Sequence, residues 1–307
     1  MVMVIKNMNF LKHSKIFFII AIIAVGTSIF SLFSFGLNLG IDFEGGSMVT
    51  VSYNDTVPSI DEVRNSLSGI DELSGLQVQA LGEKEVSLKI KEKDISNETL
   101  SLMIESLPEG IDESSVSIET ISPVIGKELK EKTLIVVVVA LLAMLSYIAL
   151  AFKSVTRPIT SLQYGLSSTL MLFHDIIIPL GLMAFLGHYY GIQLSIPIVT
   201  AFLAIIGYSI NNNIVIFDRI RENLKTGNAS YAEVVNKSLN ETFVRCLNTS
   251  FTVLIVLVPL YYFFATEESL KYFSLIMGTG IIIGFFSSLF LASPLLVSWN
   301  NFKNRKK

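Results

Sequence analysis

The stretch AIIGYSINNNIVIFDRIREN, residues 204–223, places three consecutive asparagines inside an apolar segment that ends in a charged cluster. Mostly apolar residues precede Asn211, Asn212 and Asn213, as is typical of a membrane-spanning helix. Amide groups need hydrogen-bond partners in a hydrocarbon environment, so three lipid-facing asparagines would be costly. We therefore expect at least part of this helix face to look into a helix bundle or a hydrated cavity.

Apolar segments on both sides of this stretch indicate a polytopic α-helical membrane protein. Of the 307 residues, 51% are hydrophobic, and the mean hydropathy is +0.60. Residues 38–132 are the water-compatible exception. We interpret the first span as a retained anchor, because no small-residue cleavage site follows it. The six expected spans are 15–36, 133–152, 159–187, 192–217, 246–265 and 271–298.

Lysines and arginines gather in alternate connecting segments, which sets the expected topology. They occur before the first span, after the second, after the fourth and after the sixth, whereas the short connections on the other side hold only Lys271. The positive-inside rule then places both termini in the cytoplasm and the large loop outside. The expected organisation is a cytoplasmic N-terminus (1–14), a first transmembrane helix (15–36), an extracytoplasmic domain (37–132), transmembrane helices two to six (133–298) and a basic cytoplasmic tail (299–307).

The loop after the first span is expected to form a small α+β domain. Residues 47–53, 75–82, 85–90 and 115–121 have strand patterns, and helical patterns fall within 57–70 and 95–107. The order βαββαβ predicts a ferredoxin-like sandwich. Its acidic surface has no phosphate loop or catalytic-triad spacing. This favours a domain that contacts or supports another molecule over an enzyme.

The remaining chemistry is sparse. Cys246 is the single cysteine, so no internal disulfide can form, and His13, His174 and His188 do not make a metal-ligand cluster. We expect no enzymatic activity, no cofactor, no resident metal and no nucleic-acid partner.

Several motifs resemble those of the SecD/SecF family of protein-export subunits. GIDFEGG at 40–46, directly after the first span, is similar to the family's GIDFxGG signature. GYSIN at 207–211, FDRIREN at 217–223, HD at 174–175 and RCLNTS at 245–250 are similar to the SecF form of the family. The motif residues expected to be structural are Gly40, Asp42, Phe43, Gly45, Gly46, Gly207, Tyr208 and Ser209, with the acidic side chains Asp42 and Glu44 solvated.

The resemblance covers essentially the whole chain and implies a function. SecF-type subunits pair with SecD beside the SecYEG channel in the bacterial cytoplasmic membrane, and the pair uses the transmembrane ion gradient to help pull exported polypeptides outward. Their membrane part resembles half of a resistance-nodulation-division transporter, which implies a six-helix partner. The expected partners are therefore SecD, the SecYEG translocon, an exported unfolded polypeptide and the lipid bilayer.

Asn212 stands where the family motif has an aspartate that is regarded as part of the proton pathway. An amide cannot bind or release a proton at accessible pH. Three accounts follow. In the first, protons are relayed through Asp175, His174 or an acidic residue of SecD. In the second, the amide oxygens of Asn211–Asn213 coordinate Na⁺. In the third, the chain has lost ion coupling and keeps an assembly role.

His174 and Asp175 stand well inside the third span, where ionisable residues mark functional sites by default. The alternative is a His–Asp pair that fixes helix packing. Pro179 lacks the amide that would bond the Asp175 carbonyl, which leaves an acceptor for water, a side chain or an ion. Arg245 stands at the start of the fifth span, where its side chain could either extend to the lipid headgroups or have a functional role. The ion-coupling candidates are Asn211, Asn212, Asn213, His174, Asp175, Arg245 and Asp218.

Two rival functions remain. A half-transporter for a small molecule or lipid shares the implied architecture, and a large apolar pocket in the outer domain would favour it. An intramembrane protease is disfavoured because Ile210 follows Ser209, so that the sequence around a serine nucleophile is absent.

Overall fold

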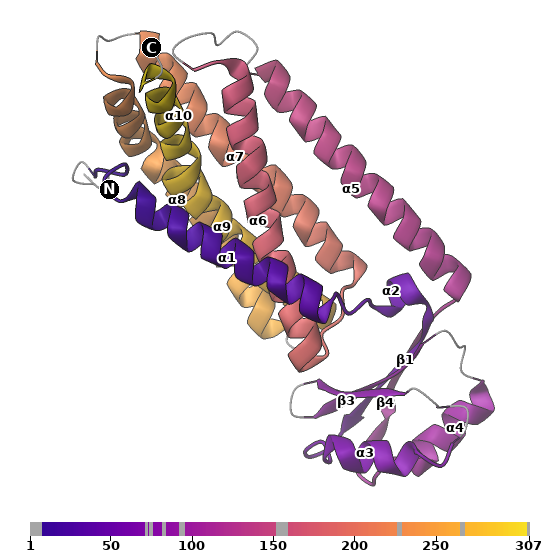
Figure 1. Cartoon of the computed structure of the whole chain (residues 1–307). Helices are drawn as coiled ribbons and strands as arrows, with labels where there is room; N and C mark the ends of the chain where they lie inside the picture. Colours follow the sequence, from indigo (N-terminus) through magenta and orange to yellow (C-terminus); the bar gives the residue numbers. More distant parts are fainter. Residues whose placement is uncertain are drawn as a thin grey trace.

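The computed structural model shows a bundle of long helices with a small α+β domain beyond one end (Figure 1). It describes residues 8–70, 73, 76–81, 84–91, 96–151, 159–225, 229–264 and 268–305. We call the end of the bundle nearest the α+β domain the domain end and the opposite end the distal end. α1 begins and α10 ends in the distal half of the bundle (Figure 1).

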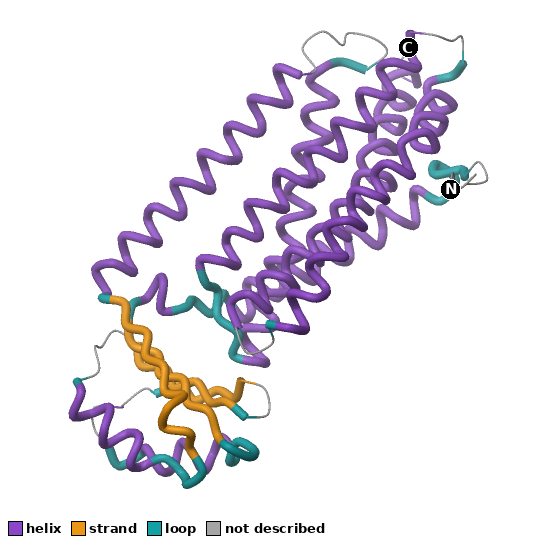
Figure 2. The backbone as a smooth tube through the Cα atoms, turned by 180° about the vertical axis from the view of Figure 1, so that it is seen from behind, coloured by secondary structure: helices purple, strands orange, loops and turns teal. Residues whose placement is uncertain are grey.

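Among the described residues, six helical units are long and apolar enough to cross a membrane, which confirms the predicted number. Figure 2 shows them running side by side along the bundle. They are α1 (Ser14–Phe35), α5 (Pro123–Ala151), α6 (Ser161–Tyr190), α7 (Ile196–Lys225), α8 (Tyr231–Phe263) and a sixth unit in which α9 (Glu268–Ser287) continues through the π-helical segment η2 (Ser288–Ala292) into α10 (Ser293–Arg305).

Two of these helices begin well before the apolar segments that the sequence marks. α5 begins at Pro123, so the last ten residues expected in the outer domain form its first turns. Its charged start remains helical, with Lys132 Nζ 2.7 Å from Glu128 Oε1 one turn away. α8 begins after the cap residue Ser230, whose backbone N–H donates to Glu233 Oε2 at 2.9 Å in a capping box. Hydropathy locates the apolar part of a helix but not its ends.

The α+β domain has the predicted order of strand, helix, two strands, helix and strand. Its four strands form an antiparallel sheet in the order β2-β3-β1-β4, and α3 and α4 lie on one face (Figure 1). The core includes Val49, Leu88, Val63 and Met103, all buried. The elements are α2 (Ile41–Glu44), β1 (Gly46–Tyr53), α3 (Ile60–Leu67), β2 (Gln77–Leu81), β3 (Glu85–Lys91), α4 (Asn97–Ser106) and β4 (Ile111–Ile121).

β4 is four residues longer at its start than the sequence pattern indicates. Its register against β1 shifts between Thr50 and Ser52, and the extra residues of β4 bulge there. Ser115 Oγ accepts a hydrogen bond from the Ser52 backbone N–H at 3.0 Å. The bulge breaks the alternation of apolar and polar residues, which is why the first part of the strand has no strand pattern.

α1 packs against α6 at a very short distance. A Cβ atom on Gly181 of α6 would lie 2.4 Å from the Ser28 Cα atom of α1, so this contact requires a glycine. Ser31 Oγ donates to the Gly181 carbonyl at 2.9 Å, three residues further along α1. This close contact fixes α1 to the helix that carries His174 and Asp175.

Candidate functional site

Asp175 lies at the centre of the bundle and is fully buried. Its Oδ2 atom accepts hydrogen bonds from Ser209 Oγ on α7 and, at 2.8 Å, from Ser287 Oγ on α9. Its Oδ1 atom lies 2.8 Å from His174 Nδ1. No lysine or arginine in the described part of the chain pairs with it. We call Asp175, His174, Ser209 and Ser287 the Asp175 site; it joins three membrane helices through one carboxyl group.

The backbone around this site is irregular in two places. Pro179 has no N–H to offer the Asp175 carbonyl, as the sequence predicts. The π-helical segment η2 follows Ser287 directly, and π-helical turns are frequent at functional sites. A Cβ atom on Gly284 would lie 3.6 Å from Asp175 Oδ2, an ordinary contact distance, so α9 packs directly beside the carboxyl group. Carboxylate, hydroxyl and freed carbonyl oxygens are also the ligands that hard cations prefer.

The three asparagines of the run lie in different surroundings. Asn211 is exposed, whereas Asn212 is 2% exposed and Asn213 is fully buried. Asn212 pairs with Tyr208, whose hydroxyl also bonds Ser250 Oγ on α8. Asn213 lies one helical turn beyond Ser209, on the face of the Asp175 site. Successive residues of a helix point about 100° apart, so the run does not form one cluster.

Asp218 and Arg245 lie apart from the Asp175 site. Asp218 is exposed near the distal end of α7, and its Oδ1 atom pairs with Arg221 at 2.7 Å. Arg245 is exposed on α8, and no ion pair with a described residue holds it. Of the residues predicted from sequence, the structure therefore brings together His174, Asp175 and Ser209, with Asn213 on the adjoining turn.

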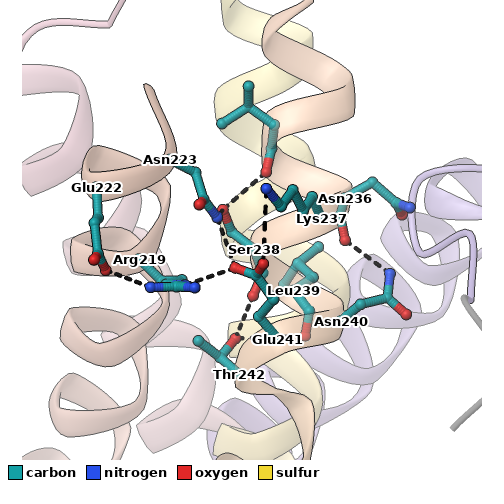
Figure 3. Close-up of polar contacts among 11 residues, drawn as sticks. Arg219, Glu222, Asn223, Asn236, Lys237, Ser238, Leu239, Asn240, Glu241 and Thr242 are labelled. Carbon is teal, nitrogen blue, oxygen red and sulfur yellow. Dashed lines mark hydrogen bonds and ion pairs between the residues drawn. The ribbon is translucent and has the colours of Figure 1, made fainter. Parts of the chain in front are cut away.

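A polar network joins α7 and α8 at the distal end (Figure 3). Arg219 Nε donates to Glu241 Oε2 at 2.6 Å, and Arg219 also pairs with Glu222 at 2.5 Å. Asn223 Nδ2 donates to Glu241 Oε2 at 2.7 Å and to Ser238 Oγ at 3.0 Å. Arg219 thus fixes the distal ends of the two helices to each other.

Ser287 is the member of the Asp175 site that sequence reasoning missed. It lies in an apolar stretch of α9, GIIIGFFSS, where serine gives no separate signal. The glycines of that stretch indicate which face of α9 packs closely against other helices. Gly280 packs against Ile205 and Gly284 against Asp175, so the small-residue face of α9 marks the side that meets α7 and α6.

The motif at 40–46 connects the α+β domain to the membrane helices. Gly40 N–H donates to the Leu194 carbonyl at 2.8 Å, and Asp42 Oδ2 accepts from the Ile196 N–H, also at 2.8 Å. Ile196 is the first residue of α7, so Asp42 caps the helix that carries the asparagines. The neighbouring Ser195 hydroxyl makes no bond with a described residue. Asp42 is therefore a helix cap and not merely solvated, because the chain returns beside the α6–α7 connection.

The second half of this motif fixes the start of α5. Gly45 has φ +73°, and a Cβ atom on it would lie 2.5 Å from Pro123 Cα. Phe43 is 5% exposed and packs in an apolar cluster with Ile198 of α7. Lys89 of β3 adds a further contact, since its Nζ atom donates to Gln193 Oε1 at 2.9 Å and to the Leu39 carbonyl at 3.1 Å. The α+β domain is thus tied to the domain ends of α5 and α7.

Replacing Asp42 by alanine should destabilise the domain end of α7. The loss of a helix cap lowers the free energy of unfolding by about 1 kcal/mol. Thermal unfolding in detergent measures this change. Asp61→Ala is the matched control, because Asp61 is exposed at the start of α3 and, within the described part of the chain, its ion pair is with Arg64 of the same helix. Equal shifts for the two variants would contradict the capping role.

Fold and site together define a multi-pass membrane protein with an ionisable group at the centre of its helix bundle. Family models make the assignment more specific. The model of the C-terminal region of the protein export membrane proteins SecD and SecF matches residues 104–302. The model of the SecD/SecF GG motif matches residues 30–57. The chain therefore belongs to the SecD/SecF family of protein export membrane proteins, which confirms the resemblance found in its motifs.

Relatives named protein translocase subunit SecF agree with this assignment. The one from Thermobaculum terrenum is 35% identical over 301 residues, covering 93% of this chain and 92% of the relative. The one from Desulfurispirillum indicum is 36% identical over 297 residues, covering 93% of this chain and 87% of the relative. The one from Petrotoga mobilis is 33% identical and covers 98% of both chains.

Solved structures show the same fold in a longer chain. SecDF from Thermus thermophilus, described as a translocon-associated membrane protein, matches with a TM-score of 0.81 at 30% identity. SecDF in a super-membrane-facing form matches with a TM-score of 0.67, also at 30% identity. This chain spans 40% of the length of each of these SecDF chains.

Proposed function

We propose that the chain is the SecF-type subunit of a two-subunit export complex in the bacterial cytoplasmic membrane. Its partner is a SecD subunit, which corresponds to the part of the SecDF chains that this chain does not cover. Together they act beside the SecYEG translocon and help move unfolded polypeptides outward at the expense of the transmembrane ion gradient. Apart from the contacts of its first turns, α5 is largely exposed within this chain, which leaves its apolar surface for lipid or for the partner subunit.

The distal end is assigned to the cytoplasm and the α+β domain to the outside. Lys12 and Lys15 near the start of α1, Arg219 and Arg221 on α7, and Lys237 on α8 lie toward the distal end. The connection 191–195 at the domain end has no lysine or arginine, so the positive-inside rule supports this orientation. The basic residues at 153, 157, 306 and 307 and the start of the chain at 1–7 lie outside the described residues.

The observation that carries the ion-coupling proposal is the complete burial of Asp175 among donors from three helices. A buried carboxylate with no lysine or arginine beside it is costly unless a protonated histidine such as His174, a bound proton or a bound cation compensates its charge. Gain and loss of a proton or cation therefore change how strongly Asp175 holds Ser209 on α7 and Ser287 on α9. Movement of α7 reaches the outer domain through Asp42, which caps its first turn.

This arrangement supports relay through Asp175 and His174 over the other two accounts. Asn212 is paired with Tyr208 and has no group that can ionise. A sodium site made by the asparagine run alone has little support, because Asn211 is exposed away from the two buried asparagines. In an assembly-only role Asp175 would serve only to hold the three helices together, whereas ionisable residues inside membrane spans mark functional sites by default.

A half-transporter for a lipid or other apolar molecule finds no support in the α+β domain. One cleft between its sheet and the bundle has a volume of about 280 Å³, and hydroxyl and carboxylate side chains line much of it, including Thr50, Ser117 and Glu119. A second cleft of about 750 Å³ is open, and polar side chains such as Arg64 and Gln79 line it together with apolar ones. An apolar substrate needs a mainly apolar enclosure.

Co-reconstitution with a SecD subunit and the SecYEG translocon tests this function. Release of an exported protein is measured with an imposed proton gradient, an imposed sodium gradient and no gradient. We expect one of the two gradients to accelerate release only when both subunits are present. Equal release under all three conditions, with SecD still bound, would leave the assembly role and contradict ion coupling.

A further inference from the structure

Three buried polar side chains near the Asp175 site have no hydrogen-bond partner in the described part of the chain. Ser168 on α6 is 1% exposed, and Asn213 on α7 and Ser293 on α10 are not exposed. The unpaired atoms are the two serine hydroxyls and both polar side-chain atoms of Asn213. Buried polar groups in proteins are almost always satisfied, either by protein atoms or by ordered water. Four such atoms on three helices that pack against one another are therefore candidates for bound water.

The two serines lie at one height on neighbouring helices. Ser167 Oγ on α6 donates to the Ala292 carbonyl at 3.0 Å, and Ala292 directly precedes α10. Ser168 and Ser293 are the next residues on each side of this bond. The serine hydroxyls of a helix often bond a carbonyl of their own preceding turn, but these two do not.

Asn213 lies close to that height and connects it to the Asp175 site. It is four residues beyond Ser209 on α7, which is about 6 Å toward the distal end. Ser168 is seven residues before Asp175 on α6, which is about 10 Å in the same direction. The unpaired groups therefore lie between the carboxyl group and the distal face.

Further hydroxyl groups continue toward the distal end. The Tyr164 hydroxyl on α6 interacts with the Tyr231 hydroxyl at the start of α8, and both residues are buried. Asn223 and Ser238 follow in the network that joins α7 and α8 (Figure 3). Hydrogen-bonding groups thus occur at successive turns from Asp175 to the distal face.

The bundle interior on the domain side of Asp175 is different. A Cβ atom on Gly280 would lie 2.3 Å from Ile205 Cδ1, so α9 and α7 are in direct contact there. The buried hydrophobic side chains around this contact are Phe43, Met183, Ile192, Leu194, Ile198, Ala201, Phe202, Ile205 and Ile276. The buried hydroxyl of Ser274 nearby already donates to the Leu270 carbonyl of its own helix, so it leaves no unpaired donor for water.

We propose that Ser168, Asn213 and Ser293 bind a short chain of water molecules that connects Asp175 with the distal face. Each water needs two to four polar partners, and the four unpaired atoms together with the Asp175 site supply them. The Asp175 site is then hydrated from the distal side and closed by apolar packing on the domain side. The proposal rests on the proposed function for its direction: protons or cations exchange between Asp175 and the cytoplasm along this water.

Cysteine labelling tests the water chain without any measurement of export. Cys246 is the single cysteine and is 2% exposed, so Cys246→Ala gives a cysteine-free background. Ser168→Cys, Asn213→Cys and Ser293→Cys are labelled with a small water-soluble methanethiosulfonate reagent in inverted membrane vesicles. The matched controls are Leu172→Cys and Ile216→Cys, which are equally buried on the same helices.

We expect the three test positions to react about tenfold or more faster than the controls, because thiol reactivity follows access of water and reagent. Labelling in inverted vesicles should also exceed labelling in right-side-out vesicles. Reaction at the slow rate of the controls would overturn the proposal.

Radiolytic footprinting gives a second reading on the unsubstituted chain, in case the cysteine variants fold poorly. Met171 lies between Ser168 and Asp175 on α6, and Met183 lies in the apolar cluster on the domain side. Hydroxyl radicals formed from bound water should oxidise Met171 faster than Met183 by clearly more than the ratio of their exposed fractions, 7% and 1%, would give. Equal rates would contradict the water chain. If the test positions were labelled fast in a protein that shows no ion-driven export, the water chain would stand and the proposed ion coupling of export would be refuted.

Discussion

Asp175→Asn should reduce gradient-driven release of an exported protein to the level of vesicles that lack the complex. The substitution keeps the size of the side chain and an oxygen that can accept from Ser209 or Ser287. It removes the group that can take up a proton or neutralise a cation inside the bundle. Release is measured in vesicles that contain the chain, its SecD partner and the translocon, with equal amounts of complex verified by co-purification.

Asp218→Asn is the comparison variant, because it removes a carboxylate of the same chain that lies exposed beside Arg221. We expect this variant to keep the gradient-driven release of the unsubstituted chain. If Asp175→Asn retained full stimulation while Asp218→Asn lost it, coupling would run along the surface of α7 and not through the buried site.

Gly181→Ala should lower the free energy of unfolding by about 3 kcal/mol, the upper end of the usual cost of overpacking, because the contact is between backbones. The new methyl group would lie 2.4 Å from both the Cα and Cβ atoms of Ser28, and backbone atoms cannot move aside as a flexible side chain can. α1 must then separate from α6, and the bond from Ser31 to the Gly181 carbonyl is stretched or lost. Unfolding by denaturant in detergent measures the change.

Gly26→Ala on α1 is the matched control. A Cβ atom there meets nothing within 4 Å, so the substitution adds helix propensity without a clash. We expect it to leave stability unchanged or to raise it slightly. A small effect of Gly181→Ala, similar to that of Gly26→Ala, would show that the α1–α6 contact can relax.

The sequence predicted the architecture well because hydrophobic segments determine how a chain enters a membrane. Six spans and an α+β domain follow from that pattern, and the strand and helix order within 46–121 follows from its periodicity. Helix ends were less predictable. The start of α8 depends on the capping box of Ser230 and Glu233, which precedes the apolar stretch by many residues.

The candidate site was predictable only in part. Asp175 is conspicuous because an acidic residue inside an apolar span is rare, but its partner Ser287 is far away in the sequence and carries no such signal. The asparagine run is conspicuous as a unit, yet a helix separates its members into an exposed residue, a partner of Tyr208 and a buried residue whose side chain bonds no described residue. Tertiary packing decides such assignments, and a single helix does not encode it.

Asp42 and the Asp175 site both contact α7. Asp175 bonds α7 near its middle through Ser209, and Asp42 bonds the first residue of the same helix. In the proposed mechanism, a shift of α7 along its axis caused by a change at the carboxyl group would therefore act on Asp42 at the base of the α+β domain. Contacts of Gly45 and Lys89 at the same place tie that movement to the sheet.

Ion flux through the complex tests the central claim most directly, because it requires neither translocon nor exported protein. Vesicles containing the chain and its SecD partner are loaded with a pH-sensitive or sodium-sensitive dye, and a membrane potential is imposed. The account predicts flux of one of the two ions in the unsubstituted complex and none in the Asp175→Asn complex. Undiminished flux through the Asp175→Asn complex would contradict the assignment of Asp175 as the ion-coupling group.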